Sequence, residues 1–349
     1  MAVRAKDLAK EIGVSEATIS LVINGKSGIS DSTRNRVRSE IIRLGFGYML
    51  KGEENNEEWN EERRNDKVIG FVLFRDHGEL LGSHSFLPYI LTGIESTARK
   101  YGCSIHLINI EKQRIDEEIQ YITKDNCLGY VIFATEMHED SLEKFRALNL
   151  PFIVFDNEFY SGNVNCVKMN NRQGILIALQ ELMKYGHRKI GYLSSGLNIN
   201  SFHERYFCAK AIARDLHLED MSKYFYEVGY PHEMAEKGME KVLQNVRKED
   251  LPTAFLCDND LVAAGAMMAI QKAGYRIPED FSIIGFDDRP ICTLMSPKLS
   301  TIRIPRRVFG AAAVEQLVRI VKEKGEVPVT VMVNGELVER ESVGPLTDY

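Results

Sequence analysis

Residues 5–24 read AKDLAKEIGVSEATISLVIN and contain two short helical patterns joined by a turn. Apolar residues such as Leu8 and Val22 recur at helical spacing. Gly13 lies between the two patterns, where a tight turn needs a residue that can adopt a positive φ. Ser15 follows as an N-cap whose hydroxyl can accept hydrogen bonds from the backbone of the second helix. The stretch therefore predicts a helix-turn-helix, although its periodicity fits any small helical hairpin equally well.

The second helix turns small and polar residues outward, which suits a helix lying against phosphates and base edges in the major groove of DNA. Residues 5–37 also resemble the headpiece of the lac/galactose repressor family. The family pattern V-S-x-x-T-V-S-x-V-x-N corresponds to Val14 to Asn24, and V-S-x-x-T-R-x-R-V corresponds to Ile29 to Val37. The resemblance implies that the DNA-binding residues are Ser15, Glu16, Ala17, Thr18, Ser20, Leu21 and Asn24.

Charge is distributed unevenly along the chain. Residues 1–50 carry eight Lys and Arg and five Asp and Glu side chains, a net charge of +3, whereas the whole chain carries −6. The positive charge is concentrated where phosphates would be met, and the resemblance implies double-stranded operator DNA as a partner. The family usually has a hinge helix after the headpiece, which enters the minor groove. Here residues 51–67 carry a net charge of −3, so we expect a largely unhelical linker that the groove's negative potential repels.

From residue 68 onward, short apolar runs alternate with amphipathic stretches. The runs read as buried parallel strands at 68–74, 103–109, 130–135 and 152–156, and again at 189–195, 224–230, 253–259 and 281–287. Two rounds of βαβ units predict an α/β fold with two doubly wound parallel-sheet lobes. Segments such as 185–193 and 259–288 also resemble the repressor family, which implies an effector domain like the periplasmic sugar-binding proteins.

These observations predict the domain organisation. We expect an all-α headpiece over 1–47, an acidic linker over 48–67 and a two-lobed effector-binding and dimerisation domain over 68–349. Lobe 1 is expected to cover about 68–165 and 297–323, and lobe 2 about 166–296 and 324–349.

The resemblance also implies a set of effector contacts between the lobes, at the carboxyl ends of strands. An Asp and an Arg can each bind vicinal hydroxyl groups with two hydrogen bonds, which favours a sugar-like small molecule. The alternative is that Asp156, Asn259 and Asp287 only cap turns and helices. The aromatic candidates could stack on a sugar face or a base, or could belong to the core. The candidate contacts are Phe86, Asp156, Arg205, Tyr230, Asn259 and Asp287.

Other classes of function find little support. No His-Glu pair extends to HExxH, the six cysteines lack zinc spacing and no GxSxG elbow occurs. We therefore expect no catalytic residues, no metal and no cofactor. The cysteines form no CxxC pair, and no run of apolar residues suits a signal peptide or a membrane span. This pattern favours a cytoplasmic protein that does not contact membranes.

The sequence thus predicts a homodimeric, ligand-responsive transcription regulator, with a repressor preferred. Two headpieces would bind the half-sites of a pseudo-palindromic operator. Two alternatives stay open: a solute-binding module with a vestigial headpiece, and an activator of the same architecture.

Overall fold

The structure is a computed structural model that describes residues 5–24, 26, 28–43, 67–76, 87–124, 127–323 and 327–346. The chain forms two compact units, Met1–Asn65 and Asp66–Tyr349. Phe86 and the expected linker lie outside the described residues, except that Lys67 already begins the first strand of the second unit. The prediction of an unhelical linker therefore stays a prediction.

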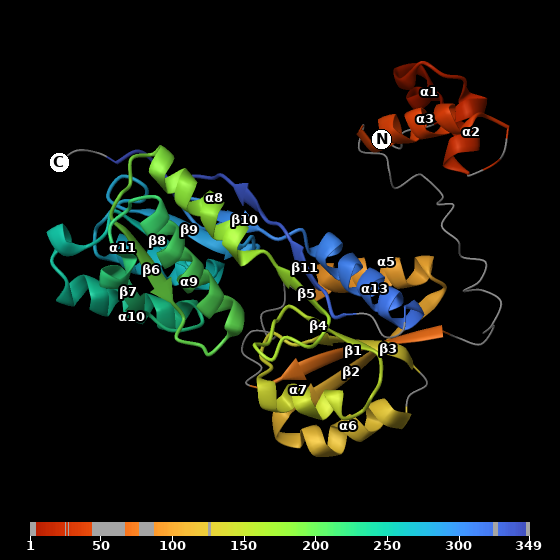
Figure 1. Cartoon of the computed structure of the whole chain (residues 1–349). Coiled ribbons are helices and arrows are strands. Elements are labelled where there is room, and N and C mark those ends of the chain that lie inside the picture. Colours follow the sequence, from red (N-terminus) through yellow and green to blue (C-terminus); the bar gives the residue numbers. More distant parts are fainter. Residues whose placement is uncertain are drawn as a thin grey trace. The chain divides into compact units, whose positions relative to one another are not determined.

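In the first unit, the described residues form a small helical bundle (Figure 1). Gly13 adopts a φ of 73° in the turn between the first two helices. Ser15 caps the second helix, as its Oγ accepts from the backbone N–H of Thr18 at 3.1 Å. Both features confirm the predicted helix-turn-helix. The helices are α1 (Ala5–Ile12), α2 (Glu16–Ile23) and α3 (Asp31–Arg43), and their shared core contains Leu8, Ala9, Ile19, Val22, Val37 and Ile41.

Lobe 1 of the second unit is a parallel sheet with helices on both faces (Figure 1). The strand order is β11-β5-β4-β3-β1-β2, with α5 and α13 together on one face and α6 and α7 on the other. The strands are β1 (Lys67–Arg75), β2 (Cys103–Glu111), β3 (Cys127–Phe133), β4 (Phe152–Phe155), β5 (Cys166–Met169) and β11 (Thr330–Val333). The helices are α5 (Leu87–Lys100), α6 (Ile115–Lys124), α7 (Glu139–Arg146) and α13 (Arg306–Lys322).

Lobe 2 repeats the arrangement with the strand order β12-β10-β9-β8-β6-β7, in which only β12 is antiparallel to its neighbour among the described strands. The strands are β6 (Ile190–Ser194), β7 (Phe225–Glu227), β8 (Ala254–Cys257), β9 (Ser282–Asp287), β10 (Ser300–Arg303) and β12 (Glu336–Val338). The helices are α8 (Asn171–Lys184), α9 (Asn200–Asp215), α10 (His232–Asn245), α11 (Asp260–Lys272) and the short α12 (Ile291–Leu294). Single 3₁₀ turns occur at Lys112–Arg114, Met221–Tyr224 and Lys248–Asp250.

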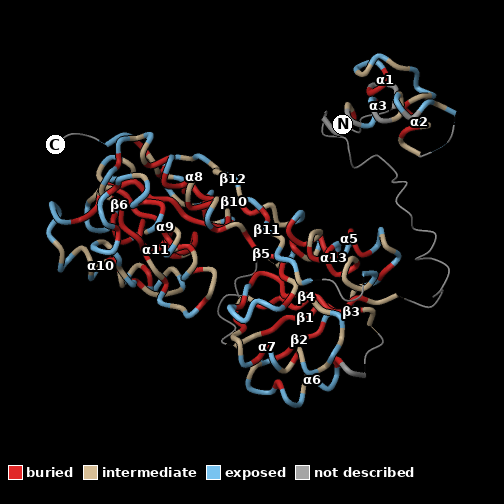
Figure 2. The backbone as a smooth tube through the Cα atoms, viewed as in Figure 1, coloured by how far each residue is buried: buried red, intermediate tan, exposed pale blue. Residues whose placement is uncertain are grey.

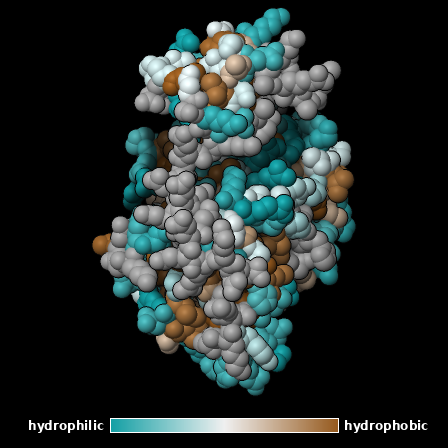
Figure 3. Space-filling model, turned by 90° about the vertical axis from the view of Figure 1, so that its right-hand side faces the viewer, coloured by the Kyte–Doolittle hydropathy of each residue, from teal (hydrophilic) through white to brown (hydrophobic). Residues whose placement is uncertain are grey.

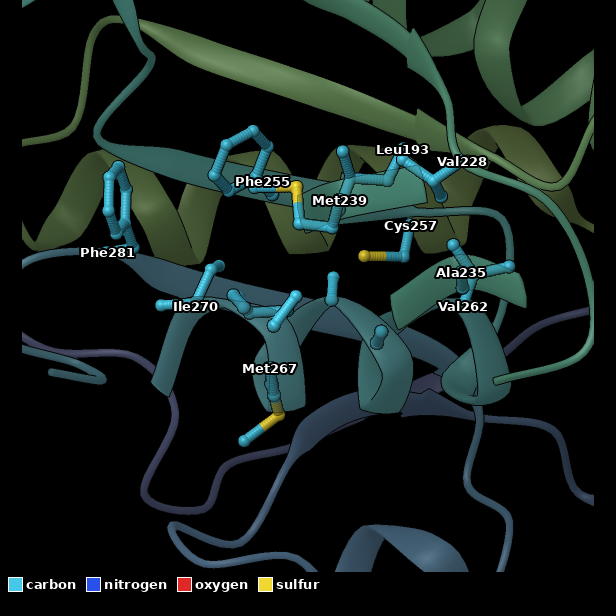
Figure 4. Packing of buried hydrophobic residues seen from close by; sticks show 14 of the residues in the cluster. Leu193, Val228, Ala235, Met239, Phe255, Cys257, Val262, Met267, Ile270 and Phe281 are labelled. Carbon is cyan, nitrogen blue, oxygen red and sulfur yellow. The ribbon is translucent and has the colours of Figure 1, made fainter. Parts of the chain in front are cut away.

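Buried residues follow the central strands and the inner faces of the helices in both lobes (Figure 2). In lobe 2, Phe255 from β8 and Phe281 pack with Met239, Met267 and Ile270 from α10 and α11 (Figure 4). On the face shown in Figure 3, hydrophobic atoms lie in separate patches among hydrophilic ones. Among the described helices, none has the length and apolar character needed to cross a membrane.

In lobe 1, an aromatic row runs across the sheet to α13. The ring centroids of Phe71 and Phe133 are 6.2 Å apart, those of Phe133 and Phe155 are 5.5 Å apart, and Phe309 of α13 follows at 4.2 Å from Phe155. Close packing of α13 on α5 requires glycine, because a Cβ added at Gly310 would lie 2.4 Å from the Ile90 carbonyl oxygen. These contacts bring α13 back to lobe 1, as expected from the sequence.

The expected lobe boundaries were wrong at three strands. β5 pairs with β4 in lobe 1 although 166–169 was assigned to lobe 2, and β11 also belongs to lobe 1. β10 pairs with β9 in lobe 2 although 300–303 was assigned to lobe 1. Short apolar strands of similar composition fit either sheet, and only long-range pairing decides between them. The chain therefore crosses between the sheets after β5, after β10 and after β11.

His187 attaches the C-terminal segment to lobe 2. It is buried, with Nδ1 2.9 Å from Thr253 Oγ1 and Nε2 3.1 Å from the carbonyl oxygen of Gly344. Burial lowers the pKa of His187, only partly offset by the hydrogen bond to Gly344. The neutral ring, with its Nε2–H donating to that carbonyl, is therefore the favoured form.

His187→Phe is expected to lower the free energy of unfolding by about 1–3 kcal/mol at neutral pH, because buried polar partners lose their hydrogen bonds. The pKa of His187 in the folded protein lies below the ordinary 6.5. The contribution of His187 to the free energy of unfolding is therefore fully present above pH 6.5, and it is lost as the pH falls below 6.5 toward the folded pKa. Urea unfolding at about pH 7 and about pH 5 should show a smaller acid-induced loss in the variant than in the wild type. The raised pKa values of Asp156 and Asp260 make the protein more stable as the pH falls, but this effect is the same in the wild type and in the variant. The same pH dependence in both proteins would contradict this role.

Candidate DNA interface and effector site

The predicted DNA-binding residues lie on and around α2. Ser15 and Asn24 hold its ends, since Ser15 caps the N-terminus and Asn24 Nδ2 donates to the Ser20 carbonyl at 2.9 Å. The side chains of Glu16, Ala17 and Ser20 are exposed. Thr18 and Leu21 are half-buried, and the Thr18 hydroxyl lies 2.9 Å from Ser15 Oγ. The exposed side chains thus leave one side of α2 open to solvent, and their contacts with DNA remain a prediction.

Leu21 is the position at which operator preference should change most clearly. The resemblance to the family implies Arg at this position in many relatives. Arg can bind guanine with two hydrogen bonds, whereas Leu cannot, although it can contact a thymine methyl group. Leu21→Arg is therefore expected to shift base preference toward guanine by about 1–3 kcal/mol. Selection of binding sites from random DNA measures the shift, with Leu21→Met as the apolar control. Identical motifs for the wild type and Leu21→Arg would refute the assignment.

A cavity of about 710 Å³ lies between the two lobes. The segment 156–162 and β5 line it from lobe 1, and residues of α8 and α9 line it from lobe 2. The volume falls in the range of pockets that bind small molecules. Its polar lining includes Asp156, Glu158, Lys168, Asn171, Asn200 and Glu204.

Asp156 is the candidate effector contact that lies on this lining. It follows β4 in a left-handed conformation, with a φ of 64°, and accepts a hydrogen bond from the Thr135 hydroxyl at 2.5 Å. Burial raises its pKa to about 7, against the lowering effects of Thr135 and of the Arg205 charge. Near neutral pH the carboxyl group can therefore either donate a hydrogen bond or accept one.

Arg205 and Asp287 are brought together in lobe 2. Arg205 is 1% exposed; its Nη2 lies 3.6 Å from Asp287 Oδ1, and its guanidinium carbon lies 3.7 Å from the ring centroid of Phe286. Asp287 ends β9 with a φ of 105°. Neither residue lines the cavity, but Arg205 Nε donates at 2.9 Å to Oδ1 of Asn171, which does line it.

Three buried charged residues of this cluster were missed by the sequence analysis. Asp258 accepts from Tyr192 Oη at 2.8 Å, and Asp260 accepts from the Thr301 hydroxyl at 2.5 Å. Arg289 Nε lies 3.3 Å from Asp287 Oδ2. Burial and the Asp287 charge together raise the pKa of Asp260 to about 7. Asp258 and Asp260 flank Asn259 after β8. The expectation that polar residues at the carboxyl ends of strands contact the effector, which selected Asn259, could therefore have found them as well.

The remaining effector candidates have different surroundings. Asn259 is fully buried and caps α11, where its Oδ1 accepts from the backbone N–H groups of Leu261 at 3.0 Å and Val262 at 3.1 Å. This geometry favours the capping alternative for Asn259. Tyr230 is half-buried and packs against the apolar side chains of Ile199 and Phe202, which favours a core role. Phe86 lies outside the described residues.

Polar contacts beside the cavity join the lobes. Asn200 Nδ2, in α9, donates to Asn157 Oδ1 at 2.9 Å and to the Glu158 carbonyl at 3.2 Å. Lys168 Nζ, in β5, donates to Glu204 Oε1 at 2.8 Å and to Glu158. Burial lowers the pKa of Lys168, but the bonds to both glutamates outweigh this effect and the pKa is raised. No local motif marks these residues, because each pair comes from distant parts of the sequence.

Two family models match this chain. The model of the bacterial regulatory proteins of the lacI family matches residues 5–47, and that of the periplasmic binding protein-like domain matches residues 179–343. The helix-turn-helix segment therefore matches the lacI family, and most of the two-lobed unit matches the periplasmic binding protein-like domain.

This chain is also similar to curated and solved proteins over almost its full length. The HTH-type transcriptional repressor PurR of Mannheimia succiniciproducens is 28% identical over 344 residues, which is 97% of this chain and 98% of that protein. The ribose operon repressor of Haemophilus influenzae is 27% identical over 340 residues, again 97% and 98% of the two chains. The lac repressor dimer bound to operator superposes with a TM-score of 0.69 at 21% identity, covering 99% of this chain and 100% of that one.

The comparisons confirm the predicted family and the α/β fold class with a helix-turn-helix headpiece. Both curated relatives are transcriptional repressors by name, and the lacI-family model matches the helix-turn-helix of this chain. Within the described parts of the chain, no three His, Cys, Asp or Glu side chains are grouped so that they could hold a metal ion.

Proposed function

We propose that this chain is a homodimeric repressor that binds operator DNA through α2 and releases or tightens that binding when a small ligand enters between its lobes. The observation that supports the ligand part of this proposal is the cavity between the lobes, which Asp156 lines from lobe 1. On the lobe 2 side, Arg205 is paired with Asp287 and reaches the cavity lining through its hydrogen bond to Asn171. These groups come from two lobes that are joined by three chain crossings. A ligand that binds both sides therefore favours one relative position of the lobes.

The chemistry of the three groups favours a ligand that is rich in hydroxyl or amide groups. Carboxylate and guanidinium groups each offer two hydrogen-bonding atoms in one plane, which suits adjacent hydroxyl groups or the edge of a heterocycle. The similarity to a ribose operon repressor supports a sugar or a sugar derivative. A coupling between ligand and operator of about 1–3 kcal/mol is typical of such two-site regulators.

A thermal-shift screen of the full chain against sugars, sugar phosphates and nucleobases tests the proposal. A ligand that binds only the folded state raises the melting temperature. A hit should also change operator affinity in a gel shift, and Arg205→Met should abolish both effects. Arg214→Met is the matched control, since Arg214 lies on the same helix with an 81% exposed side chain.

The outcomes separate the alternatives. A hit that alters neither DNA binding nor reporter expression would indicate a solute-binding module with a vestigial headpiece. Increased reporter expression with the operator occupied would indicate an activator. A hit bound equally well by folded Arg205→Met would exclude the proposed effector site.

A further inference from the structure

We propose that Lys168 of lobe 1 sets the orientation of Arg205 in lobe 2 through Glu204 and Asn171, and so couples the relative position of the lobes to the effector site. The coupling to regulation rests on the proposed role of Arg205 as an effector contact. The orientation itself follows from hydrogen bonds that do not depend on any ligand.

The first link joins the two lobes. Lys168 lies on β5, the last strand of lobe 1 before the chain crosses to α8. Its side chain is only 7% exposed and donates across the interface to Glu204 Oε1 of α9 at 2.8 Å. A buried lysine needs carboxylate partners, because its charge is strongly destabilised without them. Lys168 therefore holds Glu204 in place.

The second link passes through Asn171, the first residue of α8. The other carboxylate oxygen of Glu204, Oε2, accepts from Asn171 Nδ2 at 2.6 Å. Asn171 is 2% exposed, and its Oδ1 accepts from Arg205 Nε at 2.9 Å. If the side-chain amide of Asn171 were turned over, its NH₂ group would face the Nε–H of Arg205, and two donors would oppose each other. The Glu204 carboxylate therefore decides which atom Asn171 offers to Arg205.

The last link is Arg205 itself. Its Nη1 donates to the Asp258 carbonyl at 2.5 Å, and its Nη2 lies 3.6 Å from Asp287. These two contacts and the Phe286 ring belong to lobe 2 alone. The bond from Nε to Asn171 is the contact that connects the guanidinium to lobe 1 through the chain of Lys168 and Glu204.

Separation of the lobes would break the bond between Lys168 and Glu204, because this bond spans the interface. Glu204 and Asn171 would then be free to repack, and Arg205 would lose its fixed Nε partner. Conversely, a ligand that holds Arg205 in the observed orientation stabilises the lobe arrangement that keeps Lys168 bonded to Glu204. Linkage makes the two effects equal in free energy.

Arginine Nε–H signals report this chain of bonds directly. Two-dimensional proton–nitrogen spectra of the full protein labelled at arginine are recorded without ligand and without DNA, and the Arg205 signal is identified by its loss in Arg205→Lys. Asn171→Ala should shift that signal and speed its hydrogen exchange about tenfold, because the acceptor is removed. Lys168→Met and Glu204→Gln should produce a change in the same direction. Lys272→Met is the matched control, since Lys272 also lies between two glutamates, Glu236 and Glu240, but within lobe 2.

An unmoved Arg205 signal in folded Lys168→Met and Glu204→Gln, beside a shifted one in Asn171→Ala, would overturn the proposal. An equal shift in Lys272→Met would also overturn it, since the effect would then be a general response to charge. Glu204→Gln tests the same link if Lys168→Met does not fold. The measurement uses neither effector nor operator, so a negative result leaves the proposed regulation standing.

Discussion

Asp287→Ala is expected to lower the free energy of unfolding of the two-lobed unit by about 3–5 kcal/mol and to abolish any response to ligand. Asp287 is 5% exposed and is the carboxylate closest to two buried arginines, at 3.6 Å from Arg205 and 3.3 Å from Arg289. Removal of the Asp287 carboxylate leaves the positive charges of Arg205 and Arg289 less well neutralised in a buried site. Urea unfolding measures the loss of stability, and thermal shift with a ligand found by screening measures the loss of response.

Asp287→Asn separates the two effects. It keeps the volume and a carbonyl acceptor for the arginines, so it should retain more stability than Asp287→Ala while still losing the charge that a ligand would meet. Asp250→Ala is the surface control, because Asp250 is 52% exposed and its pair with Arg247 lies in solvent. No measurable change is expected there. Full ligand affinity in folded Asp287→Asn would rule out Asp287 as an effector contact.

Operator affinity is expected to fall on the order of 10³-fold between about 50 mM and about 200 mM salt, because neutralised phosphates release counterions. The headpiece carries a net charge of +3 over residues 1–50, although the whole chain is acidic. Thr18→Ala together with Ser20→Ala should weaken binding roughly tenfold or more by removing hydroxyl donors to phosphates. Fluorescence anisotropy with a labelled operator fragment over a salt series measures both effects.

Thr33→Ala provides the structural control for Thr18→Ala. At the start of α3, Ser30 Oγ and Thr33 Oγ1 are 2.9 Å apart, and Thr33 N–H donates to Ser30 at 3.3 Å, so the capping arrangement repeats that of Ser15 and Thr18. Loss of the threonine hydroxyl that contacts the capping serine should therefore destabilise the headpiece similarly in both variants. Equal losses of DNA affinity in both would mean that Thr18 acts through headpiece stability and not through phosphate contact.

Local sequence features were sufficient to predict the fold of the headpiece. Gly13 at a positive φ, Ser15 at the N-cap and an apolar set at helical spacing are short-range features, and the structure has all three where the sequence predicts them. The strands of both lobes were also predictable, because continuous apolar runs bounded by polar loops are typical of buried parallel strands. The positions of Asp156 and Asp287 at strand ends followed from the same pattern.

Sheet membership, partner choice and side-chain roles needed the tertiary structure. β5, β10 and β11 could not be assigned to a lobe from their residues, because a short apolar strand fits either sheet until its neighbours are known. Asn259 is a capping residue by its contacts. Lys168 and Asn171 form part of the lobe interface, although neither stands in a distinctive motif. The amino-acid sequence by itself determined the helix-turn-helix, the two-lobed α/β architecture and the resemblance to the repressor family, since these depend on periodicity and on local motifs. Only the tertiary structure decided which charges meet between the lobes, because the energy of a buried charge depends on partners that lie far away in the sequence.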